Sequence, residues 1–123
     1  MSTQPIKVVL IDDEEEFSST LAERLTLRGY ETQTAASGEA GLDLVSNQPF
    51  DIAILDLLMP GMSGLDTLRQ IKSVTPELPV VLLTGHGSTR EGMEGMRLGA
   101  FDYLMKPLDI NELTKKIHSA VKN

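Results

Sequence analysis

Short, continuous apolar runs separated by segments of helical spacing constrain this chain more than any other feature. Four such runs stand at 6–11 (IKVVLI), 51–56 (DIAILD), 78–84 (LPVVLLT) and 100–105 (AFDYLM). Because their apolar residues are consecutive rather than alternating, they are typical of strands buried on both faces of a parallel sheet. The run YETQTA at 30–35 alternates instead, which predicts an edge strand.

The segments between these strands carry apolar residues at helical spacing. Phe17, Leu21 and Leu25 recur every fourth residue. Gly29 follows them, and glycine is favoured just after a helix end. Candidate N-terminal caps precede the other four helices: Ser37, Ser63 with Asp66, Ser88 with Glu91, and Asp109 with Glu112. The pattern is strand then helix five times over, which predicts an open α/β sheet with helices on both faces.

Composition narrows the class of partner. The chain has 123 residues, 41% of them hydrophobic and 24% charged, which suits one globular domain over 1–123. Its 18 acidic and 11 basic residues give a net charge of −7. This balance argues against direct binding to nucleic acid or to an anionic membrane, so we expect protein partners or a cationic ligand.

The chain has no cysteine, which excludes disulfides, thiol nucleophiles and cysteine-rich metal sites. Its first residues, MSTQPIKVVLIDDE, lack the basic start and long apolar run of a signal peptide. No apolar segment approaches the roughly 18 residues of a membrane span. We therefore expect a cytoplasmic protein.

Polar side chains follow four of the five predicted strands. The first strand ends in Asp12 and Asp13, the third in Asp56, the fourth in Thr84 and the fifth in Lys106. In open α/β folds the ligand crevice lies outside the carboxyl ends of the strands. These side chains are therefore expected to meet at one rim.

Three carboxylates at one rim would repel each other by about a few kcal/mol per pair at intermediate dielectric, and a hard divalent cation removes that cost. Mg²⁺ is favoured because it binds through one or two carboxylates and accepts phosphate oxygens. An aspartate is also a competent nucleophile toward phosphorus, with Lys106 and Thr84 placed to stabilise the transferring group. The rim therefore indicates phosphoryl transfer.

Each of these residues also has an ordinary structural interpretation. Acidic residues are favoured in a first helical turn, so the glutamates at 14–16 are expected to form only a solvated helix start. An aspartate at a strand end often caps the next element, and a lysine before proline is commonly a loop residue. The coincidence of Asp56, Thr84 and Lys106 with the acidic pair at one rim favours the functional interpretation.

Three longer motifs stand in order behind the acidic pair: DLLMPGMSG at 56–64, LLTG at 82–85 and GAFDYLMKP at 99–107. This ordered set resembles the receiver domains of two-component response regulators, and the resemblance covers essentially the whole chain. It implies a flavodoxin-like, doubly wound, five-stranded parallel sheet of order 2-1-3-4-5 with five helices. The first and fifth helices would cover one face and the other three helices the opposite face.

The resemblance also implies a role for each acidic residue. Asp56 would be the phosphoacceptor, taking its phosphoryl group from the histidine of a partner kinase. Asp13 and Asp56 would ligate Mg²⁺ directly, together with the backbone carbonyl of Leu58, and Asp12 would act mainly through a metal-bound water. Leu58 is also expected to influence the lifetime of the phosphorylated state.

By the same resemblance, Lys106 would pair with the carboxylate and then with the phosphoryl oxygens, through a Lys106–Pro107 bond that is a candidate cis peptide. Thr84 would swing toward the phosphate, and Tyr103 would follow it inward as the switch aromatic. The implied partners are a sensor histidine kinase or phosphotransfer protein, a downstream effector protein or domain, and a second copy of the chain on phosphorylation. We expect a signalling switch rather than an enzyme.

The predicted fourth helix contains Gly92 and Gly95, each costing about 1 kcal/mol relative to alanine in a helix. Two interpretations remain open. The helix is easily remodelled, as an output element would need to be, or its small residues allow close packing on the sheet.

Other classes fit less well. Phosphohydrolases of the haloacid-dehalogenase type carry D-x-D after the first strand, whereas Asp12 and Asp13 are adjacent here and no cap segment is evident. A flavodoxin-like cofactor binder needs a phosphate loop rich in hydroxyls and glycine where this chain is strongly anionic. A degenerate receiver that binds proteins constitutively is disfavoured because all the expected acidic, hydroxyl and lysine positions are present.

Overall fold

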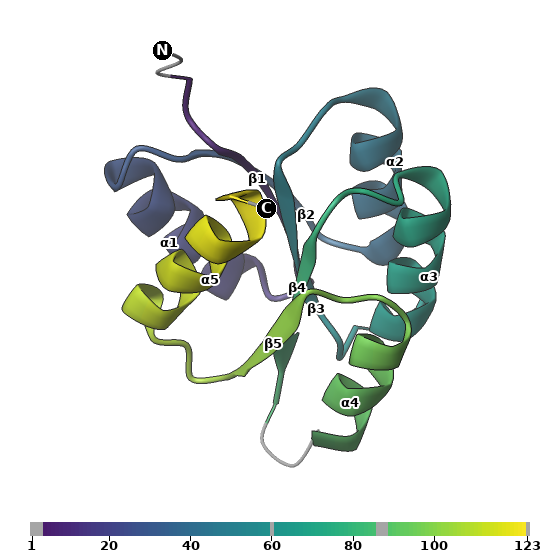
Figure 1. The fold of residues 1–123 in the computed structure, drawn as a ribbon. Coiled ribbons are helices and arrows are strands. Elements are labelled where there is room, and N and C mark those ends of the chain that lie inside the picture. Colours follow the sequence, from purple (N-terminus) through teal and green to yellow (C-terminus); the bar gives the residue numbers. More distant parts are fainter. Residues whose placement is uncertain (1–3, 60, 86–88, 123) are drawn as a thin grey trace.

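The computed structural model describes residues 4–59, 61–85 and 89–122, which form one twisted parallel sheet between two layers of helices (Figure 1). The strand order is β2-β1-β3-β4-β5, as predicted. Pro60, His86 and the candidate cap Ser88 lie outside the described residues. The strands are β1 (Lys7–Ile11), β2 (Glu31–Ala35), β3 (Ile52–Asp56), β4 (Val80–Thr84) and β5 (Asp102–Met105). The helices are α1 (Glu15–Leu27), α2 (Gly38–Asn47), α3 (Gly64–Val74), α4 (Thr89–Arg97) and α5 (Ile110–Lys122).

The continuous apolar runs divide between two cores because successive side chains of a strand point to opposite faces. In β1, Val8 and Leu10 pack with α1 and α5, whereas Val9 and Ile11 pack with α2 and α3. The helices follow this division, with α1 and α5 on one face and α2, α3 and α4 on the other (Figure 1). The central strand β3 is buried along its whole length, as the run 51–56 indicates.

Three of the capping residues predicted from the sequence accept hydrogen bonds at helix starts in the described part of the chain. The Ser37 hydroxyl accepts a hydrogen bond from the Ala40 amide at 3.0 Å, and the Ser63 hydroxyl accepts one from the Asp66 amide at 3.1 Å. Asp109 accepts from the Asn111 amide at 2.8 Å at the start of α5. Such caps satisfy backbone donors that have no partner inside the helix.

The glycines of α4 have a packing reason. A Cβ atom on Gly95 would lie 2.1 Å from Cδ1 of the buried Leu82 in β4. A Cβ on Gly92 would lie 3.1 to 3.3 Å from the Tyr103 ring. The structure therefore supports close packing of α4 on the sheet, and the remodelling of this helix stays a prediction.

Within the described ranges, no helix is long and apolar enough to cross a membrane.

Candidate functional site

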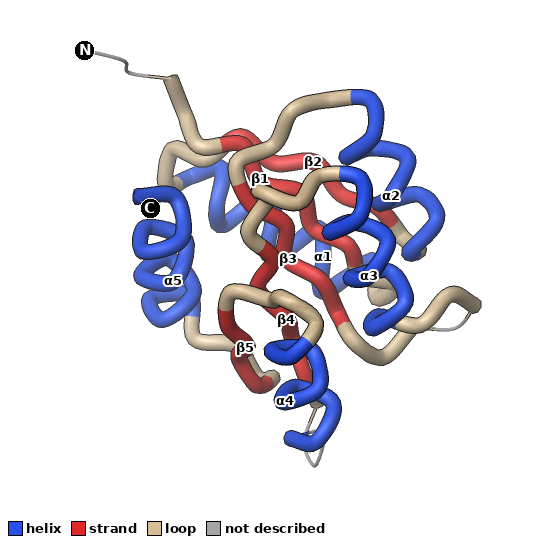
Figure 2. The backbone as a smooth tube through the Cα atoms, turned by 45° about the vertical axis from the view of Figure 1, so that its right-hand side comes forward, coloured by secondary structure: helices blue, strands red, loops and turns tan. Residues whose placement is uncertain are grey.

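The sheet topology brings the acidic strand ends together. β1 and β3 lie side by side in the sheet (Figure 2). They are parallel and Ile11 pairs with Leu55, so Asp12 and Asp56 follow at the same edge of the sheet. The strand order reverses at this pair, since β2 lies on one side of β1 and β3 on the other. In such sheets the ligand crevice lies at this switch point.

Carboxylate oxygens of Asp12, Asp13 and Asp56 lie within 4.8 Å of one another. Asp12 and Asp56 are 4% and 3% exposed, whereas Asp13 is more accessible. Buried carboxylates at this separation need a counter-charge, because desolvation and mutual repulsion both oppose ionisation.

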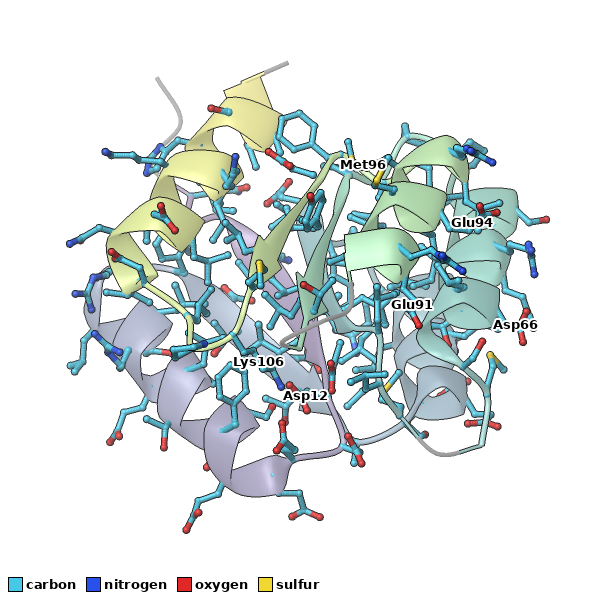
Figure 3. The ribbon with its side chains drawn as sticks, turned by 90° about the horizontal axis from the view of Figure 1, so that it is seen from below. Asp12, Asp66, Glu91, Glu94, Met96 and Lys106 are labelled. Carbon is cyan, nitrogen blue, oxygen red and sulfur yellow. The ribbon has the colours of Figure 1, made fainter. Side chains whose placement is uncertain are left out.

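Lys106 supplies part of that counter-charge from the end of β5. Its amide donates to the Thr84 carbonyl at 2.8 Å, and its bond to Pro107, a candidate cis peptide in the sequence, is cis. The ammonium Nζ lies 3.2 Å from Asp12 Oδ2 and 3.7 Å from Asp56 Oδ2, and Figure 3 shows Lys106 and Asp12 side by side. We call Asp12, Asp13, Asp56 and Lys106 the acidic rim.

The acidic rim shifts the pKa of Asp56. Burial, reinforced by the charge of Asp12, raises this pKa from 3.8 to about 6. The Leu58 amide, which donates to Asp56 Oδ1 at 3.3 Å, and the Lys106 charge both act to lower it. Asp56 is therefore a carboxylate whose charge is only partly compensated by the chain itself.

The acidic rim opens into a cavity of about 380 Å³, which is lined by Asp13, Glu14, Asp56, Leu58, Gly85 and Lys106. An all-oxygen donor set with one accessible carboxylate suits a hard cation that keeps some of its waters, so these residues fit Mg²⁺. A larger hollow of about 720 Å³ lies along α1 but contains none of the three aspartates. The cavity at the acidic rim is therefore distinguished by its side chains and not by its size.

The Thr84 hydroxyl and the Tyr103 ring make their described contacts with residues other than the carboxylates of the acidic rim. Thr84 is fully buried, and its hydroxyl donates to the Leu104 carbonyl at 3.4 Å, a long hydrogen bond. Tyr103 is half-buried, with its ring against Gly92 of α4. The roles expected of Thr84 and Tyr103 stay predictions, and Thr84 would have to rotate to reach a group on Asp56.

Lys106 also contacts two residues for which the sequence predicted no such contact, Glu14 at the N-cap of α1 and Phe17 within α1. The expectation that Glu14 is only a solvated helix start is wrong, because Glu14 Oε1 accepts a hydrogen bond from Lys106 Nζ at 2.6 Å. Phe17 was expected only to pack, but Lys106 Nζ also lies 4.2 Å from its ring centroid. Glu15 and Glu16 are exposed in the first turn, as predicted.

The Glu14 contact could have been suspected from one local signal. Glu14 is the N-cap residue of α1, where glutamate is not among the preferred residues, and its side chain makes no capping hydrogen bond. The reach to Lys106, 92 positions away, was not readable from the sequence.

Fold and site together define an open α/β protein that holds three carboxylates and a lysine at the switch point of its sheet. Residues 8–118 match the response regulator receiver domain family. The chain is 33% identical over 118 residues to the response regulator MprA of Mycobacterium sp. (strain KMS), covering 96% of this chain and 51% of MprA. It is 38% identical over 116 residues to the transcriptional regulatory protein CpxR of Escherichia coli (strain K12), covering 94% of this chain and 49% of CpxR.

A response regulator receiver domain protein from Clostridium thermocellum has a similar crystal structure, with a TM-score of 0.91 and 38% identity over 95% of this chain and 94% of that one. The chain belongs to the response regulator receiver domain family of two-component signal transduction. It spans about half the length of the curated relatives that it matches.

Proposed function

We propose that residues 1–123 form one receiver domain in which Asp56 accepts a phosphoryl group from the phosphohistidine of a sensor kinase or phosphotransfer protein. The observation that carries this proposal is the burial of Asp56 at the end of β3, within reach of two carboxylates and the Lys106 ammonium. The family supports it as well.

In the transfer, an Asp56 carboxylate oxygen forms a bond to phosphorus while the bond between phosphorus and the imidazole nitrogen breaks. The electron pair stays on that nitrogen, which takes a proton from solvent. With its pKa raised to about 6, Asp56 is largely ionised at neutral pH and available as the nucleophile. The chain is then a stoichiometric phosphoacceptor rather than a turnover enzyme.

Asp13, Asp56 and the backbone carbonyl of Leu58 would hold Mg²⁺, with Asp12 acting through a bound water. Bound Mg²⁺ would neutralise charge on the carboxylates and on the transferred group. The chain's own part is to bury Asp56 and to hold Lys106 beside it, 3.7 Å from its Oδ2. Millimolar Mg²⁺ is expected to raise the thermal midpoint of unfolding, and Asp13→Asn to reduce that rise.

We propose that phosphorylation is read out at the face formed by α4, β5 and α5. Thr84 would turn from the Leu104 carbonyl toward the phosphoryl group, and Tyr103 would move inward. Exposed apolar side chains support a protein partner here, since Met93 is 60% and Met105 is 44% exposed. The partner is a downstream effector protein or domain, or a second copy of the chain. With a net charge of −7, this segment is not expected to contact nucleic acid itself.

The experiment that tests this function is intact mass spectrometry after incubation with acetyl phosphate, in Mg²⁺ and in chelator, for wild type and Asp56→Asn. One added phosphoryl group that requires both Mg²⁺ and Asp56 is the expected result. If no adduct forms, binding of beryllofluoride distinguishes rapid hydrolysis from an inactive site. A wild-type chain that shows neither would be a degenerate receiver that acts as a constitutive protein-binding module.

A further inference from the structure

The ammonium of Lys106 is held on the α1 side of the acidic rim rather than over Asp56. Its shortest polar contact is the hydrogen bond of 2.6 Å to Glu14 Oε1, followed by 3.2 Å to Asp12 and 3.7 Å to Asp56. The Phe17 ring adds a cation–π contact from the same helix, at 4.2 Å. The contact that phosphorylation would need to shorten is therefore the longest of the three ion pairs.

Nothing local to α1 accounts for the position of the Glu14 side chain. Glu14 is the N-cap residue of α1, but its side chain makes no capping hydrogen bond, and Asp12 accepts from the Glu14 amide at 2.9 Å instead. The Glu14 side chain is 61% exposed, whereas that of Lys106 is 19% exposed. The main ordering contact of the Glu14 carboxylate is thus the Lys106 ammonium.

The contact between Glu14 and Lys106 joins two charged groups, and at 2.6 Å it is the shortest of the three ion pairs of the ammonium. A hydrogen bond between two charged groups is about twice as strong as one between neutral groups. Glu14 therefore holds the ammonium in competition with any acceptor that forms on Asp56.

We propose that Glu14 is a positioning residue that competes with the phosphoryl group of Asp56 for the Lys106 ammonium and so lowers the affinity of the site for that group. The inference rests on the proposed phosphorylation of Asp56. When a phosphoryl group or its analogue occupies Asp56, its oxygens present a stronger acceptor and Lys106 leaves Glu14. Lys106 thus loses its ion pair with Glu14 when it gains one with the phosphoryl group. The free energy of the lost ion pair is subtracted from the affinity of the site for that group.

The test is the dissociation constant of beryllofluoride at saturating Mg²⁺, measured by calorimetry on the full chain. Glu14→Gln replaces the charged acceptor by a neutral one and is expected to tighten binding about two- to fivefold, the range for a partly exposed ion pair. Glu15→Gln removes the same charge from the next residue, which is exposed, and is the matched control. It is expected to bind as wild type does.

Glu14→Asp distinguishes contact from charge. It keeps the negative charge but shortens the side chain by one methylene, and aspartate at an N-cap bonds its own helix amides. If the contact with Lys106 matters, Glu14→Asp binds more tightly than wild type, as Glu14→Gln does. If only the field of the charge matters, Glu14→Asp matches wild type and the proposal is wrong.

Unchanged or weaker beryllofluoride binding by Glu14→Gln would also overturn the proposal, since a residue that only orders the site would lose affinity when it is removed. A wild-type chain that does not bind beryllofluoride in an Asp56-dependent way would overturn the proposed function together with this inference. Wild-type binding without a difference among the variants would overturn the inference alone.

Discussion

The two sides of the crevice are stabilised by different interactions, ion pairs on one side and close packing on the other. On the α1 side, the acidic rim is joined by ion pairs that converge on Lys106 from Asp12, Glu14 and Asp56. The other side is formed by α4 and β5, and we call it the α4–β5 side. There the glycines of α4 allow close packing against Leu82 and Tyr103. On the α1 side the three carboxylates repel one another, and a bound cation or phosphoryl group would change that repulsion directly. The α4–β5 side depends on how closely side chains pack, and under the proposed function it would pass such a change to a partner.

The largest effect is expected where the backbone itself shapes the acidic rim. A Cβ atom on Gly64 would lie 2.4 Å from Leu57 Cα and 2.8 Å from the Asp56 carbonyl oxygen. Because the backbone atoms cannot move away from the added methyl group without distorting β3, we expect Gly64→Ala to destabilise the fold by about 3 kcal/mol or more. We also expect it to slow phosphorylation of Asp56. Urea unfolding measures the first effect and intact mass the second.

Ser63→Ala is the control for Gly64→Ala, since it removes the cap of α3 without a clash. Its expected cost is about 1 kcal/mol. Equal losses in the two variants would show that the close approach of Gly64 to β3 is unimportant.

The next largest effect is a gain in stability, expected when the charge of Asp56 is removed. Asp56 has a pKa of 3.8 unperturbed and about 6 in the fold, so the folded state binds more protons between these values. Stability from this group therefore falls as pH rises from about 4 to 6, and the full cost is present above about 6. Asp56→Asn removes the ionisation and is expected to stabilise the chain by about 1–3 kcal/mol at pH 7 in chelator.

Urea unfolding at pH 7 and at pH 4 checks the sign, because the gain from Asp56→Asn should be much smaller at pH 4. Asp66→Asn is the control, since Asp66 is exposed and pairs with Arg69 on the surface of α3. Its effect should stay within about 0.5 kcal/mol. A gain that is the same at both pH values would show that repulsion at Asp56 is not its cause.

On the α4–β5 side, Gly95→Ala sets helix propensity against packing. Alanine gains about 1 kcal/mol in a helix, whereas overpacking a core typically costs about 1–3 kcal/mol. A Cβ at 2.1 Å from Leu82 Cδ1 favours the packing cost, so we expect a net loss of about 1 kcal/mol. Increased stability by thermal or urea unfolding would mean that α4 is not seated on β4 as closely as described.

The smallest effect on stability is expected at Gly92. Its added Cβ would lie 3.1 to 3.3 Å from the Tyr103 ring, which is only half-buried and is expected to move by a few tenths of an ångström. The helix gain and the contact should nearly cancel, to within about 0.5 kcal/mol. The Tyr103 ring resonances should nevertheless move in NMR spectra. Unmoved resonances would show that Tyr103 is not coupled to α4.

Most of the fold follows from local sequence. The runs 6–11 and 51–56 predicted buried parallel strands because an unbroken apolar run is stable only where both faces of a strand are covered. Asp12, Asp56 and Lys106 were predicted to meet because parallel strands end at the same edge of a sheet. The ion pairs of Lys106 with Asp12 and Asp56 confirm this meeting. The roles of these residues in phosphoryl transfer stay predictions.

Side-chain contacts between distant segments were not readable in the same way. The sequence placed Glu14 in an acidic helix start, but only the folded chain brings its carboxylate to an ammonium 92 positions away. It also could not say whether Gly95 weakens α4 or seats it on Leu82, or that the Thr84 hydroxyl faces the Leu104 carbonyl. Hydrophobic periodicity determines where each helix or strand lies in the sequence, and the residues at the strand ends determine which side chains meet at one edge of the sheet. Which atoms finally touch depends on rotamers and packing across the whole core, and only the tertiary structure decides that.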